Sequence, residues 1–306
     1  MSKVALVVDN SAAMTSEELK RANVTKLVPI SFIVNGEEFY ENDTMSHEDF
    51  YRYLLDNNTE LSTSQPSIEL VKDAWREVLK DYDELIYIIL SSGLSNACNT
   101  AQNASHEDEF EGRVFVANNQ RVSYMNKMAM FVARHLINQG KSALEIKEYL
   151  EHTAGECGAY IAVDTIKYLK KGGRITPAAA AIATILNIKP ILQVHGGKLD
   201  SYAKVMAMKV AKSKIIEATR KEAEQRFAEE LKDGKLIVSI AHTYPDVNDP
   251  ELLAFKNVVK QAFPDMKFFV LDPLPAFVAC HTGPKAIGVG YAVDRLGVRD
   301  EFITED

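Results

Sequence analysis

The sequence predicts an α/β protein, because short apolar runs of strand length alternate with longer stretches of helical pattern. Most of these runs are apolar at every position, as expected for strands that are covered on both faces. The seven runs are Val4–Val8, Leu85–Leu90, Val114–Ala117, Ala159–Val163, Leu236–Ala241, Phe268–Leu271 and Ala286–Ala292. The first half of the chain therefore reads as successive strand–helix units on a parallel sheet.

Local signals mark helix starts and turns between these strands. Hydroxyl residues followed three positions later by glutamate predict two capping boxes, and an Asp-Pro pair predicts a third helix start. Two further pairs that contain glycine predict hairpins. The signals are Thr15-x-x-Glu18, Ser142-x-x-Glu145, Asp249-Pro250, Asn35-Gly36 between Ile30–Val34 and Glu37–Tyr40, and Gly196-Gly197 between Ile191–Val194 and Lys198–Ala203.

The length of 306 residues predicts two domains. We place the boundary near Gly155–Gly158, which gives a parallel α/β domain over residues 1–156 and a mixed α/β domain over residues 157–306. The second domain combines a hairpin with long helices such as Met208–Lys232. The sequence leaves open whether the last segment packs with the first domain. In sheets of this kind, ligands bind at the carboxyl ends of the strands.

Composition excludes several classes of function. The formal net charge is −8, which argues against nucleic acid as the main partner. The three cysteines are widely spaced without a C-x-x-C pair, and the seven histidines are scattered, so we expect no disulfide framework, metal site or cofactor. Val4–Val8 is too short for a signal-peptide core and Pro177–Ile188 is too short to span a bilayer. We therefore expect a cytoplasmic protein.

Two hydroxyl-rich segments at expected element ends could carry chemistry. Leu61–Ser67, with Thr63 and Ser64, precedes a helix expected over Ile68–Lys80, and taken alone its hydroxyls are better explained as caps and turn-formers. Ser91–Ala97, with Gly93, Ser95 and Asn96, follows an apolar strand. Glycine and hydroxyl residues that open a helix form an anion site, although an ordinary turn capped by Ser95 explains the same pattern.

Two further segments place charge or imidazole beside apolar sequence. Arg174 follows two glycines and precedes the apolar stretch Pro177–Ile188, which reads as a core helix or as a smooth wall for an alkyl chain. His281 lies beside Thr282 in a loop expected before the last strand. The residues of that possible wall are Ala179, Ile182, Ile185 and Leu186.

Taken in order, these segments resemble the DegV family of bacterial lipid-binding proteins. The resemblance runs from Val7–Ser11 to His281–Pro284, and it includes the stretches Pro29–Ser31, Asp164–Leu169 and Leu186–Leu192. It implies a two-domain α/β fold that buries one fatty acid at the domain interface. It also implies a binding protein, not an enzyme, that presents the lipid to a separate fatty acid kinase subunit for acyl-phosphate formation.

The resemblance assigns roles to individual residues. Thr63 and Ser95 would contact the carboxylate, and Arg174 and His281 would form the adjoining polar network. Ser64, Gly93, Asn96 and Thr282 would support them. Transient contact with a membrane surface is compatible with such a carrier. The sequence departs from the family pattern at Asn10, Asn96, Lys285, Met206 and Met208: Asn96 and Lys285 stand where glycines are expected, and the two methionines stand where arginines are expected.

Two alternatives remain open from the sequence. Gly93–Ala97 approximates a nucleophile elbow, and Asp272 and His281 follow it in the chain order of a serine hydrolase, although the second glycine is missing. The other alternative is a binder of another small anionic ligand, phosphorylated or sugar-like, that uses the same loops.

Overall fold

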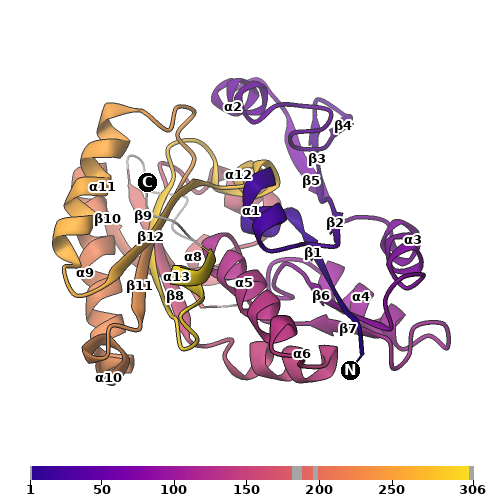
Figure 1. The fold of residues 1–306 in the computed structure, drawn as a ribbon. Helices are drawn as coiled ribbons and strands as arrows, with labels where there is room; N and C mark the ends of the chain where they lie inside the picture. Colours follow the sequence, from indigo (N-terminus) through magenta and orange to yellow (C-terminus); the bar gives the residue numbers. More distant parts are fainter. Residues whose placement is uncertain (1, 181–187, 196–198, 303–306) are drawn as a thin grey trace. The chain divides into compact units, whose positions relative to one another are not determined.

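The computed structural model describes residues 2–180, 188–195 and 199–302. The chain forms two compact units (Figure 1). The first unit contains Met1–Ser31, Ser64–Gly155 and Leu296–Asp306, and the second contains Phe32–Thr63 and Glu156–Arg295. The chain passes from the first to the second unit after Gly155, inside the boundary region expected from the sequence. Residues 32–63 also group with the second unit, because α2 (His47–Leu55) packs against α12 (Ala276–Thr282).

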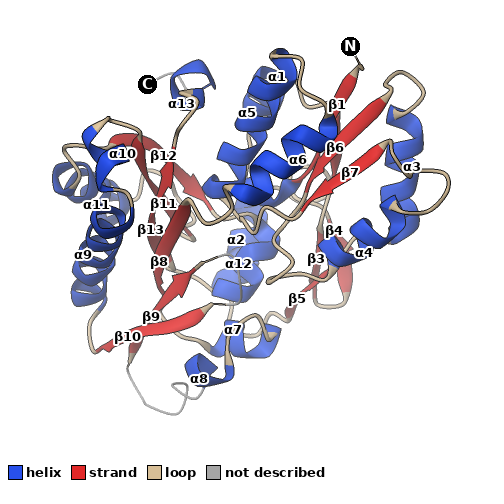
Figure 2. Cartoon of the chain, turned by 90° about the horizontal axis from the view of Figure 1, so that it is seen from below, coloured by secondary structure: helices blue, strands red, loops and turns tan. Residues whose placement is uncertain are grey.

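The first unit is built on a parallel sheet of four strands in the order β2-β1-β6-β7. Helices α3 and α4 cover one face around Trp75, and α5 and α6 lie on the other face (Figure 2). The parallel sheet predicted for the first half is therefore confirmed. The strands are β1 (Val4–Asp9), β2 (Lys26–Val28), β6 (Glu84–Ile88) and β7 (Val114–Ala117), and the helices are α3 (Ile68–Val78), α4 (Ala97–Ser105), α5 (Tyr124–Asn138) and α6 (Ala143–His152).

Shorter elements complete this unit. The 3-10 helix η1 (Asn10–Ala12) follows β1, and α1 (Ser16–Arg21) follows η1. Helix α13 (Val298–Phe302) packs against α5, where the ring of Phe302 stacks on Phe131 at 5.0 Å. Both predicted capping boxes form, at the starts of α1 and α6, so those helix starts are confirmed.

The second unit contains a mixed sheet of six strands in the order β10-β9-β8-β13-β11-β12. Only β11 and β12 pair in parallel, and the other neighbours are antiparallel. Helices α9, α10 and α11 lie on one side of it (Figure 2). The elements are β8 (Cys157–Ala162), β9 (Lys189–Val194), β10 (Asp200–Val205), β11 (Leu236–His242), β12 (Lys267–Pro273), β13 (Ile287–Val293), α9 (Met208–Arg226), α10 (Ala228–Lys232) and α11 (Pro250–Ala262).

Two expectations for this unit need correction or qualification. The single helix expected over Met208–Lys232 is wrong, because Phe227 leaves the helical conformation at φ −138° and ψ 43° and packs its ring 5.8 Å from Tyr291. The helix expected over Pro177–Ile188 begins as α8 (Pro177–Ala180), and residues 181–187 lie outside the described part of the chain. The hairpin partners β9 and β10 pair as predicted, and the tip residues 196–198 are also outside it.

A small three-stranded sheet has the order β4-β3-β5. Strands β3 and β4 precede α2 in the sequence, and β5 follows it. Its strands are β3 (Ser31–Val34), β4 (Glu37–Phe39) and β5 (Leu61–Ser64). The Asn35-Gly36 hairpin is confirmed, since both residues have the positive φ that such a turn requires, 51° and 90°. Among the residues that the structure describes, no helix is long and apolar enough to cross a membrane.

Candidate functional site

The second unit brings Thr63 and His281 into direct contact. Thr63 lies in β5 and His281 in the last turn of α12, and Thr63 Oγ1 is 2.9 Å from His281 Nε2. The sequence separates these two residues by 218 positions. The expectation of a loop around His281 is wrong, because α12 extends to Thr282 before Gly283 ends it. The first candidate pair is therefore held by regular structure on both sides.

Glycines allow α12 to approach α7 (Lys167–Gly172) closely. A side chain at Gly172 would overlap the ring of His281, so the imidazole lies directly on the backbone of that residue. At Gly283 the φ is +76° and a side chain would overlap Tyr168. Gly172 and Gly283 therefore require glycine for close packing, the first against the imidazole and the second against Tyr168. Gly173 instead ends α7 in the left-handed conformation at φ 70°, as a C-cap glycine does.

The environment of His281 keeps its ring neutral. Burial, and to a smaller extent the nearby positive charge of Arg174, lower the pKa of His281 to about 4. The guanidinium of Arg174 donates a hydrogen bond to the carbonyl of Gly172. A neutral imidazole that donates Nε2–H to Thr63 leaves the threonine hydroxyl hydrogen for another oxygen. The arrangement thus presents a donor and a cation to an anionic ligand.

The surface next to this pair is basic. A pocket of about 540 Å³ is lined by Thr165, Ile166, Lys167, Lys170 and Lys171, all on or just before α7. The same helix ends at the residue on which the His281 ring lies. Positive charge therefore extends from Arg174 along α7.

The supporting residues predicted around Thr63 and His281 serve mainly local structure. The hydroxyl of Ser64 donates to the carbonyl of Gln65, at 3.2 Å. Thr282 is buried, and its hydroxyl donates to the carbonyl of Val278 in its own helix, at 3.4 Å. Lys285 is exposed with a φ of +56°, so the charge that replaces an expected glycine points to solvent.

Ser95 lies in the first unit, in the turn between β6 and α4. Its hydroxyl accepts a hydrogen bond from the N–H of Ala97, at 3.2 Å. The carbonyl of Ser91 accepts from the N–H groups of Leu94 and Ser95, and the Ser91 hydroxyl accepts from Gly93 N–H. Asn96 has a right-handed conformation at φ −72°, so this position does not need glycine. The ordinary-turn explanation of this segment is thus met locally, but Ser95 is not the cap, because the N-cap of α4 is Asn96, which makes no side-chain cap bond. Contact of Ser95 with a carboxylate stays a prediction.

The structure describes only one residue of the predicted acyl-chain wall. Ala179 is fully buried in α8. Ile182, Ile185 and Leu186 lie outside the described residues. Met206, one of the two methionines in place of expected arginines, is 70% exposed, whereas Met208 begins α9 and packs against the core.

The geometry disfavours the serine hydrolase alternative. In a catalytic triad, one ring nitrogen of the histidine serves the nucleophilic serine. Here His281 Nε2 is engaged by Thr63, while the hydroxyl of Ser95 is engaged by its own turn. Asp272, the third predicted member, lies in the edge strand β12.

Sequence reasoning missed the role of Asp9, at the carboxyl end of β1. Its buried carboxylate accepts hydrogen bonds from Ser11 and from the N–H of Leu90, and Asn126 donates to the Ser11 hydroxyl at 2.7 Å. Burial raises the pKa of Asp9 to about 6. The signal was present as Asp9-Asn10-Ser11 at the end of an apolar strand, but Asp9 and Ser11 bond to each other and tie β1 to α5 and to the segment that follows β6, while the Asn10 side chain bonds to the backbone of Ile30.

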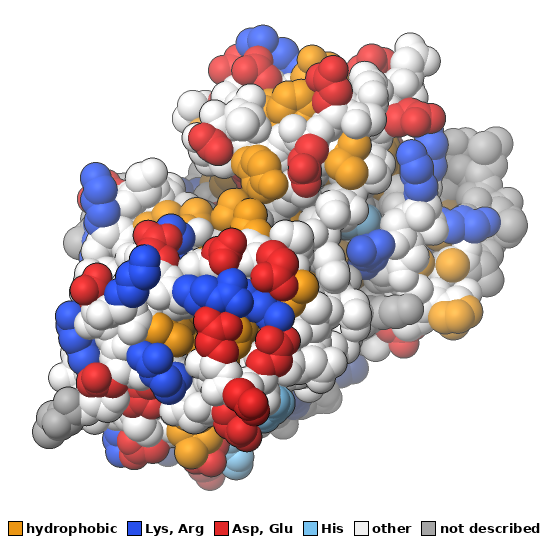
Figure 3. All heavy atoms as spheres, turned by 90° about the vertical axis from the view of Figure 1, so that its right-hand side faces the viewer, with side chains coloured by type: hydrophobic (Ala, Val, Ile, Leu, Met, Phe, Trp, Pro, Cys, Tyr) orange, Lys and Arg blue, Asp and Glu red, His pale blue; other side chains and the backbone are white. Residues whose placement is uncertain are grey.

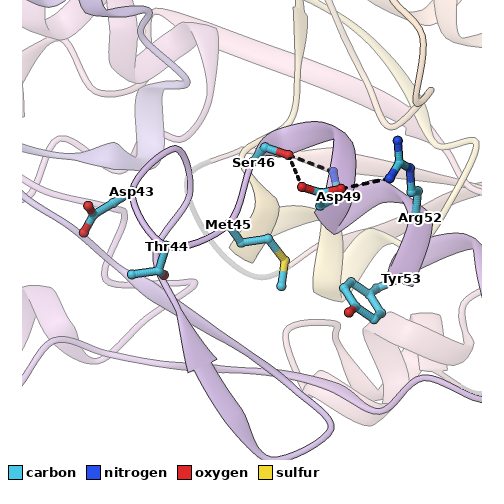
Figure 4. Close-up of a pocket in the computed structure, with 7 residues that line it drawn as sticks. All are labelled: Asp43, Thr44, Met45, Ser46, Asp49, Arg52 and Tyr53. Carbon is cyan, nitrogen blue, oxygen red and sulfur yellow. Dashed lines mark hydrogen bonds and ion pairs between the residues drawn. The ribbon is translucent and has the colours of Figure 1, made fainter.

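Two other polar surfaces have structural explanations. A pocket of about 390 Å³ lies at the start of α2 (Figure 4), and the charges of Asp49 and Arg52 in its lining are paired, since Asp49 bonds to both Ser46 and Arg52. Acidic and basic side chains are interspersed on the face that carries α3 (Figure 3), where Lys72 pairs with Glu107 and Arg76 with Glu109. Neither surface presents an unpaired cluster of one sign.

Comparisons with known proteins agree with this architecture. The family model described as "Uncharacterised protein, DegV family" matches residues 3–294. A DegV domain-containing protein of Deinococcus radiodurans is 28% identical over 288 residues, which are 94% of this chain and 97% of the relative. A structure described as "Fatty Acid Binding of a DegV family Protein from Thermus thermophilus" has a TM-score of 0.81 at 26% identity, over 95% of this chain and 99% of that one. DegV of Bacillus subtilis, described as a fatty acid binding protein, shares the fold with a TM-score of 0.80 at 24% identity, over 96% and 100% of the two chains.

Proposed function

Because this chain belongs to the DegV family, we propose that it binds one long-chain fatty acid and holds the carboxylate at the hydroxyl of Thr63, beside Arg174. The observation that carries the proposal is the hydrogen bond between Thr63 Oγ1 and a His281 ring that burial and Arg174 keep neutral. The fatty acid binding described for the relative from Thermus thermophilus supports the choice of ligand.

The head-group chemistry suits a carboxylate. An ionised carboxylate that leaves water needs hydrogen-bond donors or an opposite charge, because otherwise it takes up a proton. Thr63 supplies a hydroxyl donor, and Arg174 supplies a positive charge. A protonated His281 is not required, since its function is to orient the Thr63 hydroxyl.

The acyl chain of the lipid supplies most of the affinity. About fourteen methylenes at roughly 0.8 kcal/mol each contribute on the order of 11 kcal/mol before costs, and association costs about 4–15 kcal/mol. A hydrogen bond to a charged group contributes only about 1.5–3 kcal/mol. The residues at the carboxylate therefore set the position and orientation of the lipid, whereas the apolar surface decides which chains fit.

We also propose that the bound lipid is presented to a separate kinase subunit that forms the acyl phosphate. The lysines of α7 support this role, because phosphate transfer at the carboxylate brings additional negative charge next to Arg174. Met206 stands where an arginine is expected and carries no charge. The lysines of α7 are therefore the better-supported contact with such a subunit.

Native mass spectrometry of protein purified from cells tests the binding proposal. We expect a mass increment of one fatty acid, which organic extraction removes and added fatty acid restores. If no lipid travels with the protein and none binds on addition, fatty acid binding is excluded. Incubation of the loaded protein with ATP and a kinase of the same organism tests presentation. If Arg174→Ala leaves the rate of acyl-phosphate formation unchanged, Arg174 takes no part in the transfer.

A further inference from the structure

The two partners of the head-group hydrogen bond belong to different parts of the second unit. Thr63 ends the segment of residues 32–63, which stands in the sequence between two pieces of the first unit, whereas His281 lies on α12. We call residues 32–63 the inserted segment. Helix α7 fixes the imidazole, which lies directly on the backbone of Gly172. The 2.9 Å between Thr63 and His281 therefore depends on how the inserted segment is held on α12.

Glu41 joins the inserted segment to the opposite end of α12. Its Oε2 accepts a hydrogen bond from the N–H of Ala276, the first residue of that helix, at 2.9 Å. Its other oxygen, Oε1, lies 2.6 Å from His47 Nδ1 at the start of α2. From Ala276 to His281 the helix is about 7.5 Å long at the usual rise per residue. The inserted segment thus holds α12 near both ends, through Glu41 and through Thr63.

The loop between β4 and α2 holds the backbone of Glu41 in place. The N–H of Thr44 donates to the carbonyl of Tyr40 at 3.0 Å, and the N–H of Tyr40 donates to the Thr44 hydroxyl at 2.8 Å. Asn42 has a φ of 63°, a conformation that asparagine adopts more readily than most residues. The loop therefore closes on itself and presents the Glu41 side chain, which is only 12% exposed, from a fixed backbone.

Helix α2 reinforces the contact beside Glu41. The hydroxyl of buried Tyr51 donates to the carbonyl of Leu274, just before α12, at 3.3 Å, and its ring lies 4.4 Å from that of His47. An apolar side chain would suffice for packing here, since burying a carboxylate is costly unless its oxygens are bonded. What Glu41 adds is direction: each of its oxygens has one defined partner, so the two bonds fix where α12 begins.

We propose that Glu41, oriented by His47, is a positioning residue for the head-group site. It fixes α12 on the inserted segment, keeps His281 within hydrogen-bonding distance of Thr63, and so makes the site prefer a carboxylate to a neutral head group. The inference rests on the proposed function and specifies what maintains its selectivity. Hydrogen bonds weaken steeply with distance and angle, so a small shift of α12 is enough to misdirect the Thr63 hydroxyl.

Competition against a fluorescent fatty acid on the lipid-free full-length protein tests this, with palmitic acid and palmityl alcohol as probes. The two share one acyl chain, so the ratio of their dissociation constants reports the head group alone. We expect Glu41→Ala to lower the preference for the acid about tenfold, the loss of one hydrogen bond, and to leave binding of the alcohol nearly unchanged. Glu41→Gln keeps an oxygen for the N–H of Ala276 and should keep the preference.

Ser46→Ala is the matched control. It removes the side chain that caps α2, which accepts from the N–H of Asp49 at 3.0 Å, and so weakens the same helix without touching α12. We expect it to lower the melting temperature and to keep the preference for the acid. If Glu41→Ala does not fold, His47→Phe takes its place, because it keeps a ring against Tyr51 but removes the donor that orients Glu41. It should lower the preference in the same direction.

A double-mutant cycle shows whether Glu41 acts through Thr63. In a Thr63→Ala background, Glu41→Ala should have little further effect on the preference. Additive effects, an equal loss of acid and alcohol binding in Glu41→Ala, or a Glu41→Gln variant that behaves like Glu41→Ala would each overturn the inference while leaving fatty acid binding intact. Binding of neither probe by the unchanged protein would instead refute the proposed function.

Discussion

Thr63 and Ser95 are both hydroxyl residues at strand ends, yet the structure uses them differently. The hydroxyl of Thr63 meets an imidazole that lies 218 positions away in the sequence, whereas the hydroxyl of Ser95 bonds to a backbone N–H two positions away. A local bond is what any serine at a helix start would make. A long-range bond to a half-buried, neutral histidine has no such general explanation. The difference makes Thr63 the stronger head-group candidate.

The largest expected effect comes from removing the space for His281. Gly172→Ala would place a methyl group where the imidazole lies, and we expect a loss of about 1–3 kcal/mol in the free energy of unfolding, the usual cost of overpacking. Urea denaturation measures it, and fatty acid affinity should fall with it because the Thr63 hydroxyl loses its orientation.

The control is the double variant Gly172→Ala, His281→Ala, in which the methyl group has room. We expect this variant to recover part of the lost stability but not the affinity. Additive losses from the two changes would mean that the ring and Gly172 do not constrain each other.

The sequence accounts for much of the fold and for less of the site, for physical reasons. Apolar runs such as Val114–Ala117 and the two capping boxes were predictable because their signals are local. Strand β5 was not, since Leu-Ser-Thr-Ser has the composition of a turn and becomes a strand only by pairing in the small sheet. The contact between Thr63 and His281 depends on β5 and α12 together, so only the family resemblance could indicate it.

Thr63→Ala should have the next largest effect. The variant loses a hydrogen bond to a charged group, about 1.5–3 kcal/mol, so we expect fatty acid affinity to fall at least tenfold. Loss of the bond to His281 should also lower the stability of the lipid-free protein, by about 0.5–1.5 kcal/mol. Isothermal titration with one fatty acid measures the difference. Thr63→Ser keeps the hydroxyl and should bind nearly normally. If Thr63→Ala binds as well as the unchanged protein, the carboxylate is held elsewhere.

Ser95→Ala tests the other side of the comparison. Loss of the bond to Ala97 N–H should lower stability by about 0.5–1.5 kcal/mol, the usual net contribution of one hydrogen bond. If Ser95 also contacts the carboxylate, affinity falls and a double-mutant cycle with Thr63→Ala shows coupling. A change in stability alone, with unchanged affinity, would assign Ser95 to the turn only.

The smallest expected effect is that of pH on binding. Burial and Arg174 lower the pKa of His281 from its ordinary value of 6.5 to about 4 in the folded protein. The stability that the neutral ring contributes is therefore fully present above about pH 6.5 and is lost as the pH falls toward 4, because the unfolded chain takes up the proton first. Affinity should accordingly be nearly constant from pH 8 down to about 5.5. His281→Gln, which offers Thr63 a donor that does not titrate, should show the same flat profile. A tightening of binding by the unchanged protein near pH 6.5 that is absent from His281→Gln would show that a protonated imidazole binds the carboxylate directly, and Thr63 would then lose its place as the principal contact.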